Sequence, residues 1–425
     1  MRDDDSGEAM NSSNGPINPV DLLSPQALAD PYPFLDDLRR NDPVHWSEKY
    51  RSWFITPYAE VSDALREPLF TSNRITPYRE RVLSRSGTDP LLREAFEVLD
   101  GWMVFKDPPD HTRLRRLLSR AFTPRSVGRL KPFVEQLTDQ LLDQAIERGD
   151  GKIDLIADFA YPLTASVIAE MLGVPVEDRD KFKDWSDQIA GVVFGSLEDE
   201  DRHRRGAEGI HELTTYLSAM VEKHEKLPSD NLISTLVAAR DNNDSLSHDE
   251  VISTGVLLLF AGHETTTNLI GNGISALLEH PEQQGHINRD DPASLNALVE
   301  ELLRFDGPAK SVVRLVTEDV VWHDKQMRAG DRIFIVLSSA NRDPNMFVEP
   351  NSFDVTRPPG RHLGFSAGLH FCLGAPLARL ETSIAVPAAI DRLCNLAPDP
   401  EAPRVWSPTL LTRGMSAFPA RYDPS

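Results

Sequence analysis

The chain has 425 residues, of which 40% are hydrophobic, so it is long enough to bury a large core. Its 66 acidic and 45 basic residues give a formal net charge of −21, which argues against a general nucleic-acid-binding or anionic-membrane-binding protein. The chain has only two cysteines, Cys372 and Cys394, so a disulfide framework is not expected and a reducing, cytoplasmic environment is predicted.

The N-terminal residues 1–19 are rich in Asp, Ser, Asn and Gly and lack the apolar segment of a signal peptide. They contain too little hydrophobic material to order themselves. We therefore predict a disordered tail over residues 1–19. One large domain is expected to follow over residues 20–425, without internal repeats or a clear linker.

Helical periodicity recurs along most of the chain, whereas strand-like runs are few and short. Helices are predicted over residues 33–40, 130–146, 162–172, 210–225, 249–278, 295–305 and 373–393. Strands are predicted over residues 53–56, 312–317 and 332–336. Residues 71–105 are predicted to be irregular, and residues 177–205 to end in a solvated acidic patch. The fold class is therefore mainly α with a small β-sheet region.

Residues 107–110 contain two prolines and two aspartates just before a leucine-bearing amphipathic stretch, which marks a helix start. His111 and Arg115 share one face of this helix at i,i+4 spacing, and two such donors can hold carboxylates. A second, basic stripe on the same helix consists of Arg113, Arg116 and Arg120. Such a stripe is most often solvated surface, but in an acidic chain it is also a candidate docking site for an acidic protein.

The predicted helix 249–278 is the best candidate for a membrane span, but its continuous apolar run ends by His263 and polar residues follow. A spanning helix needs about 20 mostly apolar residues. We therefore expect a long helix that is buried in protein.

Small residues stand beside an acid and an alcohol in the middle of this helix, where residues 261–266 read Ala-Gly-His-Glu-Thr-Thr. A threonine hydroxyl can bond back to an earlier carbonyl, and a neighbouring glycine makes a bend or groove easier. A structural kink, a zincin helix and an oxygen-activating helix are the alternatives. The zincin alternative fails, because His-Glu-x-x-His needs a histidine where Thr267 stands.

Glu301 and Arg304 share a helix face at i,i+3 spacing. The same spacing occurs at residues 48–51 and 401–404, so the pair by itself carries little information. Its position between the central helix and the segment Phe-Asp-x-x-Arg-Pro at residues 353–358 makes it more specific.

Residues 365–374 read Phe-Ser-Ala-Gly-Leu-His-Phe-Cys-Leu-Gly, and the predicted helix 373–393 begins where they end. Backbone N–H groups and the macrodipole at a helix N-terminus stabilise a thiolate, so Cys372 is expected to be deprotonated and able to bind a metal. The glycines allow close approach of a flat group, and Phe365 and Phe371 supply aromatic cover. Cys394 is expected to be an inert core residue.

The segment 365–374 resembles the haem-ligating loop of the cytochrome P450 family, Phe-x-x-Gly-x-(His or Arg)-x-Cys-x-Gly, at every constrained position. The resemblance extends from about residue 21 to the C-terminus. It implies a single-domain P450 fold, with haem b buried between the long central helix and the cysteine loop and Cys372 as the axial iron ligand. By the same resemblance Phe365, Gly374 and Ala261 contact the haem.

The resemblance assigns roles to further residues that match the family pattern. The expected propionate ligands are His111, Arg115, Arg314 and His370. Glu264 and Thr265 would relay protons for oxygen activation, while Ala261 and Gly262 would leave room above the haem. A buried structural network would consist of Glu301, Arg304 and Arg357.

The expected activity is that of a haem-thiolate monooxygenase, which inserts one atom of dioxygen into a hydrophobic small molecule by hydroxylation or epoxidation. Terpenoid, steroid, polyketide and fatty-acyl substrates of secondary metabolism all remain open. The pocket walls are predicted to be apolar and to come from residues 71–105, 192–194, 258, 312–313 and 410–411.

Electrons are expected from NAD(P)H through a separate ferredoxin and its reductase, with the ferredoxin docking on Arg113, Arg116 and Arg120. The protein is expected to be a monomer that binds neither nucleic acid nor membrane. Two alternatives stay open: a peroxygenase or reductase that works without ferredoxin, and a haem-binding sensor without turnover.

Overall fold

The computed structural model describes residues 21–84, 89–119, 122–194, 201–241 and 244–424. The predicted tail, residues 1–19, lies outside the described residues, so the domain boundary at residue 20 stays a prediction. The α-helices are α1 Pro25–Ala29, α2 Tyr32–Asn41, α3 Tyr58–Ala64, α4 Ile75–Leu83, α5 Pro90–Asp100, α6 Asp110–Leu118, α7 Pro124–Gly128, α8 Lys131–Arg148, α9 Tyr161–Leu172, α10 Arg179–Val193, α11 Arg202–Lys226, α12 Leu232–Val237, α13 His248–Glu279, α14 Pro292–Asp306, α15 Leu337–Ala340 and α16 Ala375–Arg392.

Short 3-10 turns and a π-helix complete the helical part: η1 Met103–Phe105, η2 Leu155–Ala160 (the π-helix), η3 Val176–Asp178, η4 Pro281–His286 and η5 Gly368–His370. The strands are β1 Val44–Ser47, β2 Ser52–Ile55, β3 Phe70–Thr71, β4 Lys152–Asp154, β5 Arg240–Asp241, β6 Asp244–Ser245, β7 Val312–Val316, β8 Val320–Trp322, β9 Lys325–Met327, β10 Arg332–Ile335, β11 Ala397–Pro398, β12 Val405–Trp406, β13 Met415–Ala417 and β14 Pro419–Arg421. The predicted fold class, mainly α with a small sheet region, is confirmed.

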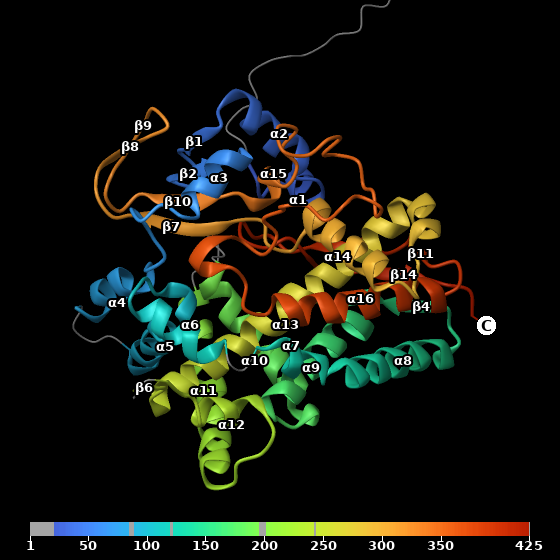
Figure 1. Cartoon of the computed structure of the whole chain (residues 1–425), viewed down its shortest axis with the longest axis horizontal. Coiled ribbons are helices and arrows are strands. Elements are labelled where there is room, and N and C mark those ends of the chain that lie inside the picture. The colour runs from blue at the N-terminus through green and yellow to red at the C-terminus, as the bar shows by residue number, and fades with distance from the viewer. Residues whose placement is uncertain (1–20, 85–88, 120–121, 195–200, 242–243, 425) are drawn as a thin grey trace, which may run out of the picture.

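The largest sheet has five strands in the order β1-β2-β10-β7-β3 and lies beside α1, α2 and α3, at the top of the molecule in Figure 1. Strand β10 runs parallel to β2 and antiparallel to β7, so it joins the N-terminal hairpin to the segment that carries Arg314. In this register Arg314 stands opposite Ile333. The sheet therefore fixes where Arg314 lies relative to the helices below it.

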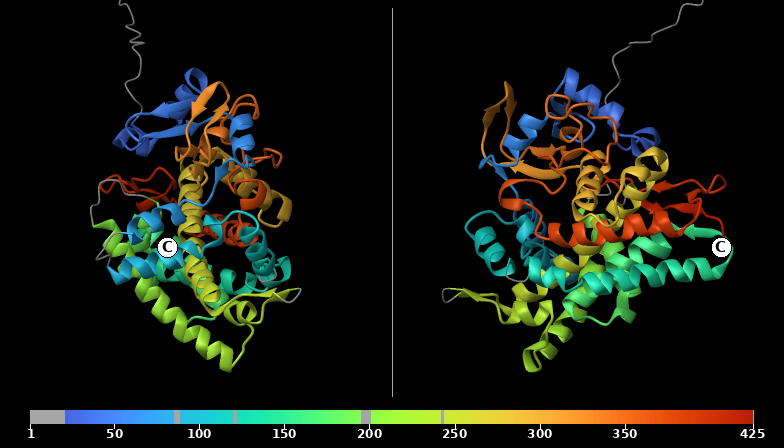
Figure 2. Two further views of the ribbon diagram at one scale, coloured as in Figure 1. Left: turned by 90° about the vertical axis from the view of Figure 1, so that its left-hand side faces the viewer. Right: turned by 45° about the vertical axis from the view of Figure 1, so that its right-hand side comes forward.

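Helix α13 crosses the centre of the molecule, with α16 alongside it (Figures 1 and 2). It begins at a capping box, in which the Glu250 N–H donates to Ser247 Oγ at 3.2 Å and the Ser247 N–H donates to Glu250 Oε2 at 2.9 Å. Most of its residues are buried on every side, as expected for a helix in the core of a large protein. The predicted buried central helix is thus present.

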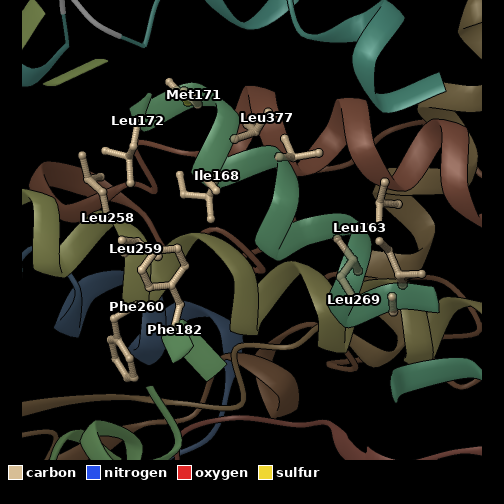
Figure 3. Close-up of a cluster of buried hydrophobic side chains, with 14 of the residues drawn as sticks. Leu163, Ile168, Met171, Leu172, Phe182, Leu258, Leu259, Phe260, Leu269 and Leu377 are labelled. Carbon is tan, nitrogen blue, oxygen red and sulfur yellow. The ribbon is translucent and has the colours of Figure 1, made fainter. Parts of the chain in front are cut away.

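The contact between α9 and α13 forms a large part of the core, where Leu163, Ile168 and Leu172 face Leu258 and Leu269 (Figure 3). A Cβ at Gly262 would lie 2.9 Å from the Cδ1 and Cγ1 atoms of Ile168. This glycine therefore allows α9 to pack closely on α13. The expectation that Gly262 also leaves room above the haem stays a prediction.

One segment differs from its prediction. Residues 71–105 were expected to be irregular, but they contain α4 and α5, and Asp89 caps α5 by accepting from the Leu91 N–H at 2.9 Å. Helix α10, whose buried face includes Phe182 and Ile189, was not among the predicted helices. Charged residues on the solvent side of these short helices hid their apolar faces. The acidic patch predicted at the end of residues 177–205 lies partly outside the described residues, which exclude 195–200.

Cys394 is exposed at the end of α16, so the prediction that it is a core residue is wrong. Neither Cys372 nor Cys394 is in a disulfide bond.

By length and composition, the segment of the described chain that could cross a membrane is Leu155–Leu172, and 83% of that window is buried inside the protein. A core helix of this composition passes the same test, so the segment is weak evidence for a membrane span.

Candidate haem-thiolate site

Cys372 lies in the loop that leads into α16. Its N–H donates to the carbonyl oxygen of Phe365 at 3.0 Å, and the Ser366 N–H donates to Leu363 O at 2.8 Å. Ser366 and Gly368 both adopt positive φ, of 62° and 69°, which turns the loop back on itself. A Cβ at Gly374 would lie 4.0 Å from the Cys372 sulfur. The loop therefore presents the sulfur beside the first turn of α16.

Burial raises the pKa of the Cys372 thiol, although the Gly374 N–H, the Arg115 charge and the Ala375 N–H all act to lower it. The expectation that the helix N-terminus by itself keeps this sulfur deprotonated is therefore wrong, because the cost of desolvating the charge is larger. A cation bonded to the sulfur would supply the missing stabilisation, since metal ligation deprotonates a thiol. The site thus suits a metal ligand better than a free reactive thiol.

Four donor side chains gather near this sulfur. The rings of His111 and His370 have centroids 4.2 Å apart, and the charges of Arg115 and Arg314 both lower the pKa of His370, after burial, which is the largest cause. His370 Nε2 is 2.9 Å from Ser72 Oγ. The structure therefore brings together the four residues that the sequence assigned to haem propionates.

These donors have few acceptors among the described residues. His111 is completely buried, and neither of its ring nitrogens has a hydrogen-bond partner. Arg314 is 7% exposed and donates only to its neighbour's carbonyl, Val313 O, at 2.9 Å. Buried donors of this kind are costly to leave unpaired, so the cluster fits a group that carries carboxylates. The propionates of a haem meet that requirement.

Ala261 on α13 is exposed, although Phe260 and His263 beside it are buried. Phe365 in the cysteine loop is buried, and the guanidinium of Arg379 lies over its ring at 4.6 Å from the centroid. A small residue on α13 and an aromatic ring next to the sulfur are compatible with a flat macrocycle between α13 and the cysteine loop. The residues present therefore fit a haem.

The acid and the alcohol of α13 lie next to each other in an unbroken helix. Thr265 Oγ1 donates to the carbonyl oxygen of Ala261 at 3.1 Å, the back-bonding expected from the sequence. Burial raises the pKa of Glu264 to about 8, and the negative charge of Asp187 adds to the effect. Glu264 is thus mostly protonated at neutral pH and can donate a proton.

Glu301, Arg304 and Arg357 form one buried ionic network. Arg304 binds both carboxylate oxygens of Glu301 at 2.7 Å, and Arg357 Nε lies 3.2 Å from Glu301 Oε2. Arg304 also donates to the backbone oxygens of Asn341, Pro350 and Ser352. The other two Glu-x-x-Arg segments lack this pairing, and Arg404, for example, pairs with Glu279 instead.

A second network near the cysteine loop was not foreseen from the sequence. Glu300 Oε1 lies 2.6 Å from Arg379 Nε on α16, and Glu300 Oε2 lies 2.9 Å from His362 Nε2. Burial opposes the ionisation of Glu300, but the His362 and Arg379 hydrogen bonds lower its pKa to about 2. No fixed spacing in the sequence links residues that lie this far apart. The network ties α14 to both ends of the cysteine loop.

The basic stripe on α6 is partly neutralised. Arg113 pairs with Glu250 at the start of α13 and lies 3.4 Å from Asp244, while Arg116 lies 3.5 Å from the same aspartate. Arg120 lies outside the described residues. The stripe therefore offers a partner less charge than the sequence indicates.

A cavity of about 670 Å³ opens between the sheet and the helices α4, α5 and α10. Its walls include predicted segments, namely residues 192–194, Val313 and 410–411, together with parts of 71–105. Leu258 and Val312, which were also predicted, are not among the lining residues. The walls are not simply apolar as predicted, since arginines also line them: Arg51, Arg74, Arg81, Arg202 and Arg332. The sequence could have indicated these basic side chains, because residues 71–105 contain several arginines.

Residues 79–290 and 292–405 match the family model described as Cytochrome P450. The chain is 37% identical over 417 residues to the cytochrome P450 monooxygenase PikC of Streptomyces venezuelae, an alignment that covers 97% of this chain and 95% of the relative. It is also 37% identical over 417 residues to the vitamin D(3) 25-hydroxylase of Pseudonocardia autotrophica, with 95% and 96% covered. The structure of P450BioI in complex with hexadec-9Z-enoic acid ligated acyl carrier protein superposes with a TM-score of 0.84 at 34% identity, covering 93% of this chain and 99% of that one.

Proposed function

The chain belongs to the cytochrome P450 family and is a monooxygenase of that family, and we propose that it hydroxylates or epoxidises a mainly hydrophobic small molecule. The observation that carries the proposal is the cluster of donor side chains near Cys372, in which buried His111 has no hydrogen-bond partner, in a chain whose helix α13 carries an adjacent acid and alcohol. A haem-binding protein needs donor side chains for the propionates, and oxygen activation uses an acid and an alcohol that deliver protons.

We propose haem b as the cofactor, with Cys372 as the axial iron ligand. His111, Arg115, Arg314 and His370 would hold the propionates, and Phe365, Gly374 and Ala261 would lie against the macrocycle. When bound, the haem supplies the activation of dioxygen. The fit of unpaired donors to carboxylates supports this assignment, because it removes the cost of the buried His111 and Arg314 groups.

Protein side chains would supply the protons. Burial, with the negative charge of Asp187 adding to its effect, raises the pKa of Glu264 to about 8, so Glu264 holds a proton at neutral pH. Thr265 stands one residue further along α13 and already has one acceptor, Ala261 O. We propose that Thr265 passes protons from Glu264 or ordered water into the oxygen site, which must otherwise exclude bulk water.

We propose that electrons come from NAD(P)H through a separate ferredoxin-type protein. Of the two described residues of the basic stripe, Arg116 is the more exposed, with 47% of its side chain exposed against 30% for Arg113. An Arg116→Glu variant should raise the KM for ferredoxin several-fold and leave ligand binding unchanged. An unchanged KM would exclude docking at this stripe.

The substrate is proposed to be a hydrophobic compound that a cavity of about 670 Å³ can hold. The names of the relatives include a vitamin D(3) 25-hydroxylase and a protein in complex with a fatty acyl group on its carrier, which supports polycyclic or acyl substrates. A cytoplasmic location and a monomeric state are parts of the same proposal.

The central test is the spectrum of the reduced protein with carbon monoxide. The wild type and Cys394→Ala should both give the red-shifted band of a thiolate-ligated haem, whereas Cys372→Ala should lose it. Cys394→Ala is the matched control, since it removes an exposed thiol at the far end of α16. Retention of the band in Cys372→Ala would exclude the assigned ligand.

Turnover assays then distinguish a monooxygenase from a peroxygenase and from a sensor. Oxidation that needs NAD(P)H, ferredoxin, its reductase and dioxygen supports the proposal. Efficient oxidation with peroxide as the sole co-reactant would indicate a peroxygenase. Ligand binding without oxidation under any of these conditions would indicate a sensor.

A further inference from the structure

The charged residues of the cavity are unusual for this chain. Of the described residues that line it, only Asp331 is acidic, whereas arginines enter from several elements: Arg51, Arg74, Arg81, Arg202 and Arg332. The chain as a whole has a net charge of −21, so carboxylates are plentiful elsewhere. The charge of the cavity wall is therefore opposite in sign to the net charge of the protein, which indicates a local function for these arginines.

Arg74 and Arg332 have no carboxylate partner among the described residues. Arg74 donates to Val193 O at 3.3 Å and lies over the Phe105 ring at 4.9 Å. Arg332 donates to Ser52 Oγ at 3.0 Å and, more weakly, to Tyr50 O at 3.5 Å. Both guanidiniums are held by neutral acceptors, which fixes their position and leaves their charge unbalanced.

Asp331, the acidic residue of the cavity wall, does not pair with Arg74 or Arg332. Asp331 Oδ2 accepts from Trp53 Nε1 at 3.0 Å and from the Arg328 N–H at 2.9 Å, and it forms no ion pair in the described part of the chain. Other buried arginines of the described chain are of two kinds. Arg413 pairs with Asp306 at 3.0 Å, whereas Arg314 and Arg342 have only neutral acceptors. Arg74 and Arg332 thus resemble Arg314, which is assigned to a carboxylate of the haem.

Burial lowers the pKa of Arg74 to about 10, and the charges of Arg314 and Arg332 add to the lowering. Burial also lowers the pKa of Arg332. Both guanidiniums line the same cavity, so two partly desolvated positive charges border one space. An anion bound there would offset their desolvation and the effect of the Arg332 charge on Arg74.

We propose that Arg74 and Arg332 bind the carboxylate of an amphipathic substrate whose apolar body occupies the rest of the cavity. This inference rests on the proposed function and adds a substrate class to it. A carboxylate matches the planar, bidentate geometry of a guanidinium, and charge-assisted hydrogen bonds of this type are about twice as strong as neutral ones. Arg51 and Arg81 are exposed and line the same cavity, so they would attract the anion before it binds.

The rest of the wall suits the apolar body. Aromatic and aliphatic side chains line the cavity together with the arginines, among them Phe96, Leu99, Val313 and Leu411. A substrate anchored at Arg74 and Arg332 would therefore pack its apolar part against these side chains.

The test compares carboxylates with their neutral counterparts. Tetradecanoate and abietate are each titrated against their own methyl ester, into wild-type protein and into Arg74→Gln and Arg332→Gln variants, with both calorimetry and the haem spin-state change as readouts. Arg148→Gln is the matched control, because it removes one partly exposed arginine at the end of α8, across the molecule from α4 (Figure 1). Haem content is measured for every variant.

In the wild type we expect at least one carboxylate to bind about tenfold more tightly than its ester, with a preference that weakens as salt is added. Each cavity variant should lose about tenfold for the carboxylate and little for the ester, while Arg148→Gln should change neither. The proposal is overturned if no carboxylate is preferred, or if Arg332→Gln weakens carboxylate and ester equally. It is also overturned if Arg74→Gln loses haem while Arg332→Gln keeps full carboxylate affinity, since Arg74 would then serve the propionates.

These outcomes are distinct from a failure of the proposed function. Calorimetric binding of the carboxylate without any oxidation would contradict monooxygenase activity on such substrates and leave the anion site intact. Oxidation of neutral compounds by all of the variants at wild-type rates, without a carboxylate preference, would keep the function and remove the anion site.

Discussion

The guanidinium of Arg304 meets the carboxylate of Glu301 through two parallel hydrogen bonds, each 2.7 Å long, at a place where both side chains are about 2% exposed. Arg304 also donates to Asn341 O at 3.1 Å, and Asn341 Oδ1 accepts from the Leu363 N–H at 2.7 Å. Leu363 begins the loop segment that leads to Cys372. The ion pair on α14 is thus connected by hydrogen bonds to the loop that carries the proposed iron ligand.

Replacing Glu301 by Gln should destabilise the protein by roughly 3–5 kcal/mol, because it leaves the buried Arg304 charge without its partner. Urea denaturation of the haem-containing protein measures the loss, and haem retention on dilution should fall with it. Glu401→Gln is the control, since Glu401 also belongs to a Glu-x-x-Arg segment but its side chain is 78% exposed and pairs with Arg421. That variant should change stability by less than about 1 kcal/mol, and equal losses in the two variants would contradict a structural role for the network.

Replacing Glu264 by Gln should stabilise the protein at high pH. Burial raises the pKa of Glu264 to about 8 from its ordinary 4.5, so between these values the folded state holds a proton that the unfolded state has lost. The stability of the wild type therefore falls as pH rises through this window, and the variant escapes that fall. The variant should gain about 1–3 kcal/mol over the wild type by pH 9 and nearly nothing at pH 4.5.

Denaturant titrations at several pH values measure this difference. Exposed Glu222, replaced by Gln, serves as the control and should give a difference that does not grow with pH. A Glu264→Gln difference that is constant across pH would show that the carboxyl is ionised in the folded protein.

Replacing Lys310 by Met should have the opposite pH dependence. Lys310 is 6% exposed, and its amino group has no hydrogen bond or ion pair in the described part of the chain. Burial, with the charge of Arg413, lowers its pKa to about 7 from 10.5, and Asp306 opposes this only in part. Between pH 7 and 10.5 the unfolded state binds more protons than the folded state, so wild-type stability rises with pH.

The Lys310→Met variant should therefore be more stable than the wild type by about 1–3 kcal/mol below pH 7, with the gain vanishing toward pH 10.5. Exposed Lys223, replaced by Met, is the matched control and should show no such trend. A gain that persists unchanged at pH 10.5 would mean that methionine simply packs better, and that the charge of Lys310 is not the cause.

Replacing Thr265 by Ala should uncouple electron consumption from substrate oxidation. NADH oxidation should continue, while the product formed per NADH falls at least about tenfold and hydrogen peroxide appears, because a positioned proton donor contributes that much or more. Thr266 is the control, as the adjacent threonine whose hydroxyl lies 3.5 Å from Gly262 O and whose side chain is buried. Normal coupling in Thr265→Ala, or equal uncoupling in Thr266→Ala, would contradict the role given to Thr265.

Long amphipathic or fully apolar segments could be located from the sequence because burial repeats with the helical period. Helices α8, α9, α13 and α16 were all predicted to within a few residues of their observed ends. Short helices such as α4 and α10 were missed, since a few turns with charged residues give a weak period. The solvent exposure of Cys394 was also not predicted, because exposure at a helix end depends on which other elements pack against it.

The sequence by itself determined the cysteine loop, the acid and alcohol at 264–265 and the Glu301–Arg304 pair, because each is a local arrangement in which spacing along the chain sets the geometry. Only the tertiary structure decided which way Gly262 faces, how Glu300 joins His362 to Arg379, and that Arg74 and Arg332 line one cavity without carboxylate partners. Those relationships join residues far apart in the chain, and burial and charge at each of them depend on elements that meet only after folding. The substrate preference proposed for this monooxygenase belongs to that second group.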